Sequence, residues 1–463
     1  MKQERIKNII LISMVLVCVY LSSNVWLKLP DFIKYKGETG EDTKQEEIAA
    51  ADIWDVVRPI KNVIKYKDNY TITYSDEQDI WGKSVYVIND AFNNFNASSI
   101  NESAAFPSQY LKFDFSTNIP VEIFLGQMKI ENKDIQFRIK NIKNIIIDLE
   151  NTNAIYIYNG ENTVKIESSN INTGEISNIV KQFDFENKTD YAFEQKINGE
   201  TIQVPIPLET TAQTPVFVQS ELDVFDTDTI NQIAKNYFKG RYDYVRKSVE
   251  VSGNTVFMYR TEKVLKINSE GLLDFYDTTE ELENSSDVYD SFIRAVEFTN
   301  EFLGFPKDGY LSGVENIEYE GNYGFRYIFS YKILERPILF SRVRENSALQ
   351  IDVIGDSVIS YKRFIRDIDE FQMNEKIETP IPAVDVIVSN LEEESDPRNP
   401  EDIPELKPLK RDMIKNISNI YLGYFDISRV SKDQALRVVW VIEVGDKSYI
   451  FNAITGKLIE EWQ

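Results

Sequence analysis

Histidine is absent from the 463 residues of this sequence. Its absence excludes Ser-His and Cys-His catalysis, His-ligated zinc or haem, and a proton switch built on histidine. Cysteine is nearly absent as well, since Cys18 is the only one. A single thiol excludes intramolecular disulfides and thiolate metal clusters. Any enzyme built from this sequence would therefore depend on carboxylates, Lys, Tyr or Ser.

Basic residues are few relative to acidic ones. Lys and Arg total 51 against 75 Asp and Glu, which leaves a formal net charge of −24 at pH 7. A negative field of this size repels phosphate backbones, so the composition argues against nucleic-acid binding. With 42% hydrophobic and 27% charged residues, the sequence is typical of a globular protein. Its length allows roughly three domains at about 150 residues each.

One long uncharged apolar segment is present, from Ile9 to Leu27. It has about the length that a helix needs to cross a bilayer. Lys2, Arg5 and Lys7 precede it and Trp26 stands near its end, a pattern typical of a helix whose N-terminus is cytoplasmic. The sequence thus predicts a single-pass protein of the cell membrane, with a short cytoplasmic stub and the bulk of the chain extracytoplasmic.

Other interpretations of this segment fit less well. A cleaved signal peptide needs small residues before the cleavage point, and the stretch around Ser22 and Ser23 provides them poorly, while apolar character continues to Leu27. A lipoprotein would be acylated at Cys18, but Val17 stands where a small residue is required. A buried core helix would have one apolar face, whereas this N-terminal segment is apolar on all faces.

The predicted membrane helix also offers a candidate contact face for a partner. At about 100° per residue, one side of the helix carries Leu11, Val15, Cys18, Ser22 and Val25. Cys18 and Ser22 form a small-xxx-small pair that lets a second helix approach closely. The alternative, that these small residues are merely tolerated in lipid, fits the same pattern.

The rest of the sequence predicts an α+β fold made of extracytoplasmic modules, each an antiparallel sheet with a helix. The proposed organisation is a cytoplasmic stub and transmembrane helix (1–28), a tether (29–50), an N-terminal α+β domain (51–205), a central domain of repeated helix-plus-sheet modules (206–391), an acidic linker or loop (392–408) and a C-terminal α+β module (409–463).

Elements within the N-terminal domain follow from periodicity and turn residues. A hairpin is expected over 52–75, with its turn at 67–69, and a helix over 76–95. Strands are expected over 120–126, 133–140, 144–150 and 153–166, the last as a hairpin of two strands about the turn Asn159-Gly160, and a further helix is expected over 174–183.

Three amphipathic helices are predicted downstream, each closed by a glycine that can adopt a left-handed conformation. They cover 226–239, 287–303 and 410–422, with Gly240, Gly304 and Gly423 as the stops. The third carries apolar residues at Met413, Ile414, Ile417, Ile420 and Tyr421. Strands follow each helix, so this part of the chain looks like diverged copies of one module.

No motif in the sequence carries chemistry. Dinucleotide-binding, P-loop and nucleophile-elbow patterns are missing, and close carboxylate pairs are expected by chance among 75 acidic residues. The acidic clusters at 223–229 and 393–396 lack EF-hand spacing, and Asp226 and Asp228 stand where a helix N-cap is expected. We therefore expect a protein without catalytic residues, metal sites or cofactors.

Several segments resemble the YycH family of membrane-anchored accessory proteins. The likeness lies in the basic N-terminus with its span ending in Trp, and in DVVRPIKNVI, FPSQYLKFDFSTNIP, IYIYNGENTVKI and VPIPLE. In the C-terminal half, RYIFSYKI, DVIGDSVISYKRF and YIFNAITGKL resemble the small modules of the partner protein YycI and of PepSY-type domains.

This resemblance implies a non-enzymatic regulator of the YycG/YycF (WalK/WalR) two-component system of Gram-positive bacteria, which controls cell-wall metabolism. It implies association with the sensor histidine kinase YycG (WalK) and with YycI, partly through membrane helices, and it implies no catalytic residues. Two other interpretations stay open: a ligand-binding or peptidase-inhibiting module of PepSY type, and a carboxylate-dependent wall hydrolase.

Overall fold

The structure is a computed structural model that describes residues 53–95, 105–197, 199–213, 215–279, 282, 284, 287–341, 347–369, 377–391, 408–427 and 434–462. All of them belong to Glu46–Gln463, one of the two compact units of the chain. The predicted membrane helix, the tether and nearly all of the acidic linker fall outside the described residues. Within the described ranges, no helix is both long and apolar enough to cross a membrane.

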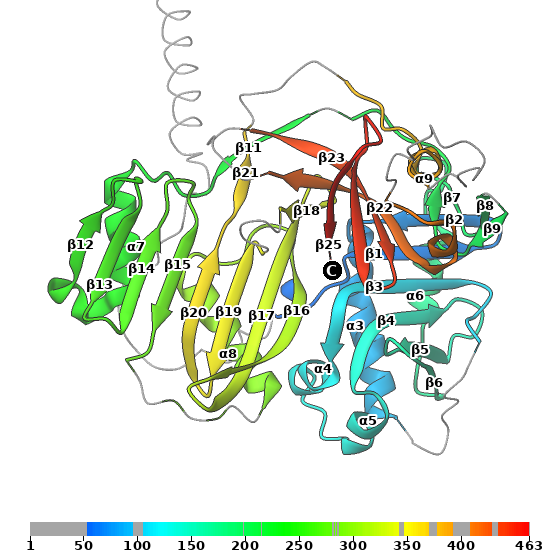
Figure 1. Ribbon diagram of the computed structural model, residues 1–463. Helices are drawn as coiled ribbons and strands as arrows, with labels where there is room; N and C mark the ends of the chain where they lie inside the picture. Colours follow the sequence, from blue (N-terminus) through cyan, green and yellow to red (C-terminus); the bar gives the residue numbers. More distant parts are fainter. Residues whose placement is uncertain are drawn as a thin grey trace, which may run out of the picture. The chain divides into compact units, whose positions relative to one another are not determined.

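The first part of this unit is a six-stranded antiparallel sheet with strand order β2-β1-β3-β4-β5-β6 (Figure 1). Its strands are β1 (Lys61–Tyr66), β2 (Asn69–Thr73), β3 (Tyr110–Pro120), β4 (Asn141–Asp148), β5 (Ala154–Tyr158) and β6 (Thr163–Glu167). A short 3-10 turn, η1 (Glu77–Asp79), leads into α3 (Ile80–Asn93), and α6 (Gly174–Lys181) follows the sheet. Both predicted hairpins, the predicted long helix and the helix after the sheet are confirmed.

Two segments of this domain were predicted as strands but are short helices. They are α4 (Val121–Gln127) and α5 (Lys133–Arg138). The first was predicted as a strand from its β-prone residues, but it is a helix in which Val121, Ile123, Phe124 and Leu125 are all buried. Short apolar runs do not distinguish the two structures by periodicity. The side chain of Asn132 caps α5 by accepting the backbone N–H of Asp134.

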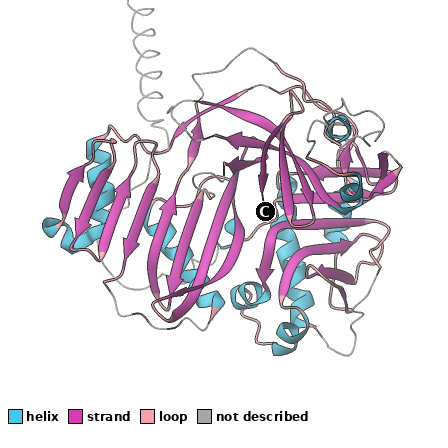
Figure 2. Cartoon of the chain, viewed as in Figure 1, coloured by secondary structure: helices cyan, strands magenta, loops and turns pink. Residues whose placement is uncertain are grey.

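The second part is built on a fifteen-stranded sheet with the main order β12-β13-β14-β15-β20-β19-β17-β18-β22-β23-β11-β21. Strand β16 pairs with β17, β24 with β23, and β25 with β24. Among the ladders of the described residues, β18 and β22 pair in parallel and the others are antiparallel. Figure 2 shows the predominance of strands, which makes this a mixed α+β fold with antiparallel sheets, as predicted.

The strands of this sheet are β11 (Val216–Ser220), β12 (Arg246–Val249), β13 (Thr255–Tyr259), β14 (Lys263–Ile267), β15 (Leu273–Asp277), β16 (Gly309–Tyr319), β17 (Asn322–Ile333), β18 (Arg336–Phe340), β19 (Leu349–Ile354), β20 (Ser357–Arg363), β21 (Arg366–Ile368), β22 (Ile417–Asp426), β23 (Gln434–Val444), β24 (Lys447–Asn452) and β25 (Leu458–Trp462). Two small ladders pair β7 (Tyr191–Ala192) with β10 (Ile206–Pro207), and β8 (Gln195–Ile197) with β9 (Glu200–Ile202).

Two of the three downstream helices lie where the sequence predicts them. They are α7 (Thr227–Phe238) and α8 (Val288–Phe302), capped by the side chains of Asp226 and Asp287. Gly304 has a φ of 68°, as expected of the residue that ends α8. After α7, however, Lys239 takes the positive φ of 46° in place of Gly240, at the start of the 3-10 turn η3 (Lys239–Tyr244).

The third predicted helix, over 410–422, is wrong. A 3-10 turn, η4 (Arg411–Asn416), is followed directly by β22. A β-bulge between Ile417 and Asn419 places Ile417 and Ile420 among the buried residues at a spacing of three, which imitates a helix face. Gly423 is not a helix stop but a point of close approach, because a Cβ there would lie 2.4 Å from Leu339 Cδ1 of β18.

The helix that packs on these C-terminal strands comes earlier in the chain. It is α9 (Ala383–Ser389), whose Ala383, Val386 and Ile387 are buried in the same cluster as Trp440 of β23. The indole N–H of Trp440 donates to the carbonyl of Ile381, 2.8 Å away, just before α9. This helix was not predicted from the sequence, and the domain boundaries proposed from the sequence stay predictions.

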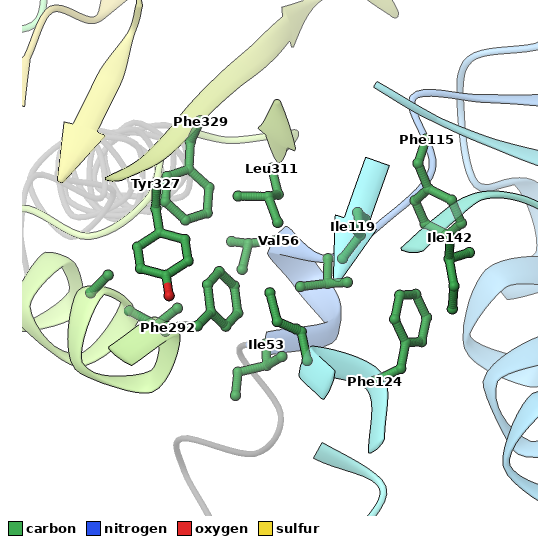
Figure 3. Close-up of a cluster of buried hydrophobic side chains, with 14 of the residues drawn as sticks. Ile53, Val56, Phe115, Ile119, Phe124, Ile142, Phe292, Leu311, Tyr327 and Phe329 are labelled. Carbon is green, nitrogen blue, oxygen red and sulfur yellow. The ribbon is translucent and has the colours of Figure 1, made fainter. Parts of the chain in front are cut away.

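A single apolar cluster joins the six-stranded sheet to the larger one. A helical turn at residues 53–56 places Ile53 and Val56 between the two groups of side chains (Figure 3). The N-terminal group includes Phe115, Ile119, Phe124 and Ile142, and the other group includes Phe292, Leu311, Tyr327 and Phe329. Gly126 of α4 lies against Tyr289 of α8 so closely that a Cβ would be 2.3 Å from the ring.

Polar contacts follow the same junction. Arg58 pairs with Asp308 at 3.0 Å between Nη2 and Oδ1. The ammonium of Lys332, a buried residue of β17, donates to the carbonyls of Ile60 and Tyr74 at the two ends of the β1–β2 hairpin. Burial, followed by the charge of Arg58, lowers the pKa of Lys332 from 10.5 to about 8.

The lowered pKa of Lys332 predicts a pH dependence of stability. Between about pH 8 and 10.5 the unfolded chain holds more protons at this site than the folded protein does, so the contribution of Lys332 to the free energy of unfolding rises with pH. We compare the free energy of unfolding of the wild-type protein with that of the Lys332→Met variant. The difference, wild type minus variant, should increase by up to about 3 kcal/mol as the pH rises across this range. Urea unfolding at several pH values measures it, and a difference that stays constant contradicts the assignment.

Candidate functional site: a cleft between two sheets

The structure describes some of the residues that the sequence analysis singled out and not others. The membrane-helix face of Leu11, Val15, Cys18, Ser22 and Val25 lies outside the described residues and stays a prediction. So does the acidic cluster at 393–396.

The acidic cluster at 223–229 is a helix cap, as the sequence predicted. Asp226 Oδ1 accepts the backbone N–H groups of Asp228 and Thr229, and its Oδ2 accepts the Thr229 hydroxyl at 2.7 Å. The bonds from Thr229 lower the pKa of Asp226 below its ordinary value. In the described part of the chain, no three acidic or cysteine side chains gather as metal ligands would.

A cleft of about 340 Å³ lies between the six-stranded sheet and the C-terminal strands. Figure 1 shows β22 close to β1 and β3, and the Nζ of Lys61 donates to Asn419 Oδ1 at 2.6 Å. The wall formed by β1, β3 and β4 presents Lys61, Lys112, Asp114, Lys143 and Asn144. The wall formed by β22 and β23 presents Ser418, Asn419, Tyr421 and Glu443.

The alternation of β3 places charged side chains in this cleft. Leu111, Phe113 and Phe115 are buried in the core, while Lys112 and Asp114 project from the opposite face of the strand. Antiparallel pairing then aligns Asp114 with Lys61 of β1 and with Asn144 of β4. The result is a row of polar side chains across three strands.

Asp114 is the centre of this row. Its Oδ2 lies 3.6 Å from the ammonium of Lys61 and 3.9 Å from that of Lys112, and its Oδ1 accepts the Asn144 amide at 2.7 Å. Burial alone would raise the pKa of the Asp114 carboxyl, but Lys61, Lys112 and Lys143 outweigh it and the pKa lies below its ordinary value. Asp114 therefore stays ionised near neutral pH.

The three lysines differ in how well they are satisfied. Lys61 donates to Asn419, and Lys143 donates to the carbonyls of Phe115 and Ser116 at 2.8 and 3.0 Å. For Lys112, the contacts within the described residues comprise the 3.9 Å ion pair with Asp114 and no hydrogen bond. Burial lowers the pKa of Lys112. Its ammonium can donate three hydrogen bonds, and none of them is made to the described residues.

The tyrosine on the opposite wall completes the electrostatic environment. The ring of Tyr421 faces the ammonium of Lys61, with 6.0 Å between Nζ and the ring centroid. Burial, together with the neighbouring Glu443 carboxylate, raises the pKa of the Tyr421 hydroxyl well above its ordinary value. This hydroxyl is therefore a neutral hydrogen-bonding group.

Sequence reasoning missed this cleft. The segment LKFDF alternates apolar and charged residues, which is the sequence signal for the first wall. In the sequence analysis this segment supported only the family resemblance. The second wall could not be recognised, because the first half of β22, which carries Ser418, Asn419 and Tyr421, was predicted as a helix. Lys61 and Asn419, which meet across the cleft, are 358 positions apart in the chain.

A match to a known protein family covers the N-terminal part of the chain. Residues 4–187 match the family described as YycH protein, N-terminal domain. The search of curated proteins finds no match. Nine chains of solved structures match. One is an uncharacterized protein from Eubacterium rectale ATCC 33656, with 12% identity and a TM-score of 0.33 over 54% of this chain and 86% of that chain.

A structural likeness with a TM-score of 0.33 carries no argument about this chain. The family match is different, because it is continuous from before the predicted membrane segment, through the whole six-stranded sheet, to beyond α6. Residues 4–187 therefore correspond to the N-terminal domain of the YycH family.

Proposed function

We propose that this protein is a membrane-anchored, non-enzymatic regulator that associates with the sensor histidine kinase YycG (WalK) and with YycI. In this role it modulates the two-component signalling that controls cell-wall metabolism. The observation that carries the proposal is the match of residues 4–187 to the N-terminal domain of the YycH family. That family consists of membrane-associated regulatory proteins.

Composition supports a role without catalysis. The sequence has no histidine, the commonest general acid or base, and only one cysteine. Two buried arginines of the described chain form structural ion pairs. Arg363 binds Glu221 with 2.6 Å between Nη2 and Oε1, and Arg366 binds Asp426 at 3.0 Å.

The proposed topology follows from the uncharged segment Ile9 to Leu27 and the basic residues that precede it. We expect protease added to intact protoplasts to digest nearly the whole protein and to spare only a short N-terminal fragment. Detection with antibodies against the two ends of the chain measures this. Full protection of the chain would contradict the topology.

The proposed association predicts that one face of the membrane helix matters more than another. The double variant Cys18→Leu/Ser22→Leu keeps the segment hydrophobic and fills the groove between two small side chains. We expect membrane insertion to persist, while co-purification with the kinase from native membranes falls and kinase-dependent transcription changes.

The matched control is Ser13→Leu/Val17→Leu, which makes two similar changes away from the proposed face. We expect this control to co-purify with the kinase as wild type does. If both double variants behave alike, the proposed face is wrong. If no histidine kinase co-purifies with the wild-type protein, the proposed function is wrong.

A further inference from the structure

We propose that the cleft between β1, β3 and β4 on one side and β22 and β23 on the other binds a small anion that carries a phosphate or carboxylate group. The proposal concerns the chemistry of the cleft alone, and it stands whether or not the protein associates with a kinase. Three properties of the cleft support it: its charge, the ammonium of Lys112, which makes no hydrogen bond to the described residues, and its size.

The charge of the cleft is opposite to that of the protein. Lys61, Lys112 and Lys143 face Asp114 and Glu443, three positive groups against two negative ones. The whole chain has a formal net charge of −24. A local excess of positive charge between two low-dielectric walls attracts an anion more strongly than the same charges would on an open surface.

Lys112 supplies the free hydrogen-bond donors. Its side chain is 23% exposed, so it reaches solvent within the cleft while most of it is buried. Lys61 and Lys143 already donate to Asn419 and to two backbone carbonyls. An anionic oxygen beside Lys112 would complete the coordination of this ammonium, and charge-assisted bonds of this kind are the strong ones.

The size of the cleft indicates the class of ligand. Its volume of about 340 Å³ is at the small end of the range found for small-molecule sites. Asn144, Ser418 and the neutral Tyr421 hydroxyl add polar groups around the lysines. A small anion with hydrogen-bonding oxygens fits this set, whereas an extended polymer does not.

The walls of the cleft come from both sheets, which has a consequence for stability. The ligand would contact β3 on one side and β22 on the other, so it would bind the folded protein and not the unfolded chain. Bound ligand then raises the free energy of unfolding in proportion to the logarithm of its concentration.

The test uses the full-length protein in detergent micelles. Inorganic phosphate and malonate are titrated separately at constant ionic strength, with sodium chloride as the non-specific control, and binding is followed by calorimetry and by the thermal unfolding temperature. We expect saturable binding of at least one of the two anions. Phosphate alone, or malonate alone, identifies which anionic group the cleft prefers.

Two lysine variants make the test specific. Lys112→Met removes the ammonium and should weaken binding by at least about tenfold, the usual consequence of losing one charge-assisted hydrogen bond. Lys165→Met is the matched control, because Lys165 lies on the same row of the same sheet face, reached from Lys112 through Ile146 and Tyr156, but does not line the cleft. We expect this control to bind as wild type does.

Lys112→Gln serves if Lys112→Met does not fold, because it removes the charge and keeps a polar head. Absence of saturable binding to wild type overturns the proposal. So does equal weakening by the Lys112 and Lys165 variants, which would show a general charge effect. Failure of kinase co-purification with intact anion binding would overturn the proposed function and leave this inference in place.

Discussion

Burial of Ile53 and Val56 is the interaction that holds the two sheets together. These side chains lie between the aromatic and aliphatic residues of the six-stranded sheet and those of α8, β16 and β17, so the apolar cluster has no break between them (Figure 3). Each fully buried side chain of this kind contributes about 1.5–3 kcal/mol relative to an exposed one. Separation of the sheets would expose both groups to water at once.

The polar contacts depend on this apolar junction. The Arg58–Asp308 pair, the bonds from Lys332 to the β1–β2 hairpin and the bond from Lys61 to Asn419 all connect segments distant in sequence. Such contacts contribute little unless the backbone is already fixed, since a pair of charged side chains must be ordered and partly desolvated to form. The cleft also depends on this apolar junction, because its two walls meet only when the sheets are held in register.

The parts of the fold that sequence predicts are those with long, regular periodicity. The helices α3, α7 and α8 repeat their apolar residues over three or more turns, and the hairpin at Gly160 has a turn residue that tolerates its φ of 99°. The short helices α4 and α5 offer too few residues to separate helical from strand spacing. The bulge in β22 shifts the period by one residue, which made Ile417 and Ile420 imitate a helix. The cleft was beyond prediction because it requires the long-range pairing of Lys61 with Asn419.

Hydrogen exchange on the full-length protein with Ile53→Ala tests whether the two sheets share one core. The truncation should cost about 2–5 kcal/mol, as buried Ile-to-Ala changes do. If the core is shared, amide protection should fall together in β3 and β4 and in β16, β17 and β19, by similar factors. Loss of protection in only one of the two sheets would show that they unfold independently, and would contradict a junction built on Ile53 and Val56.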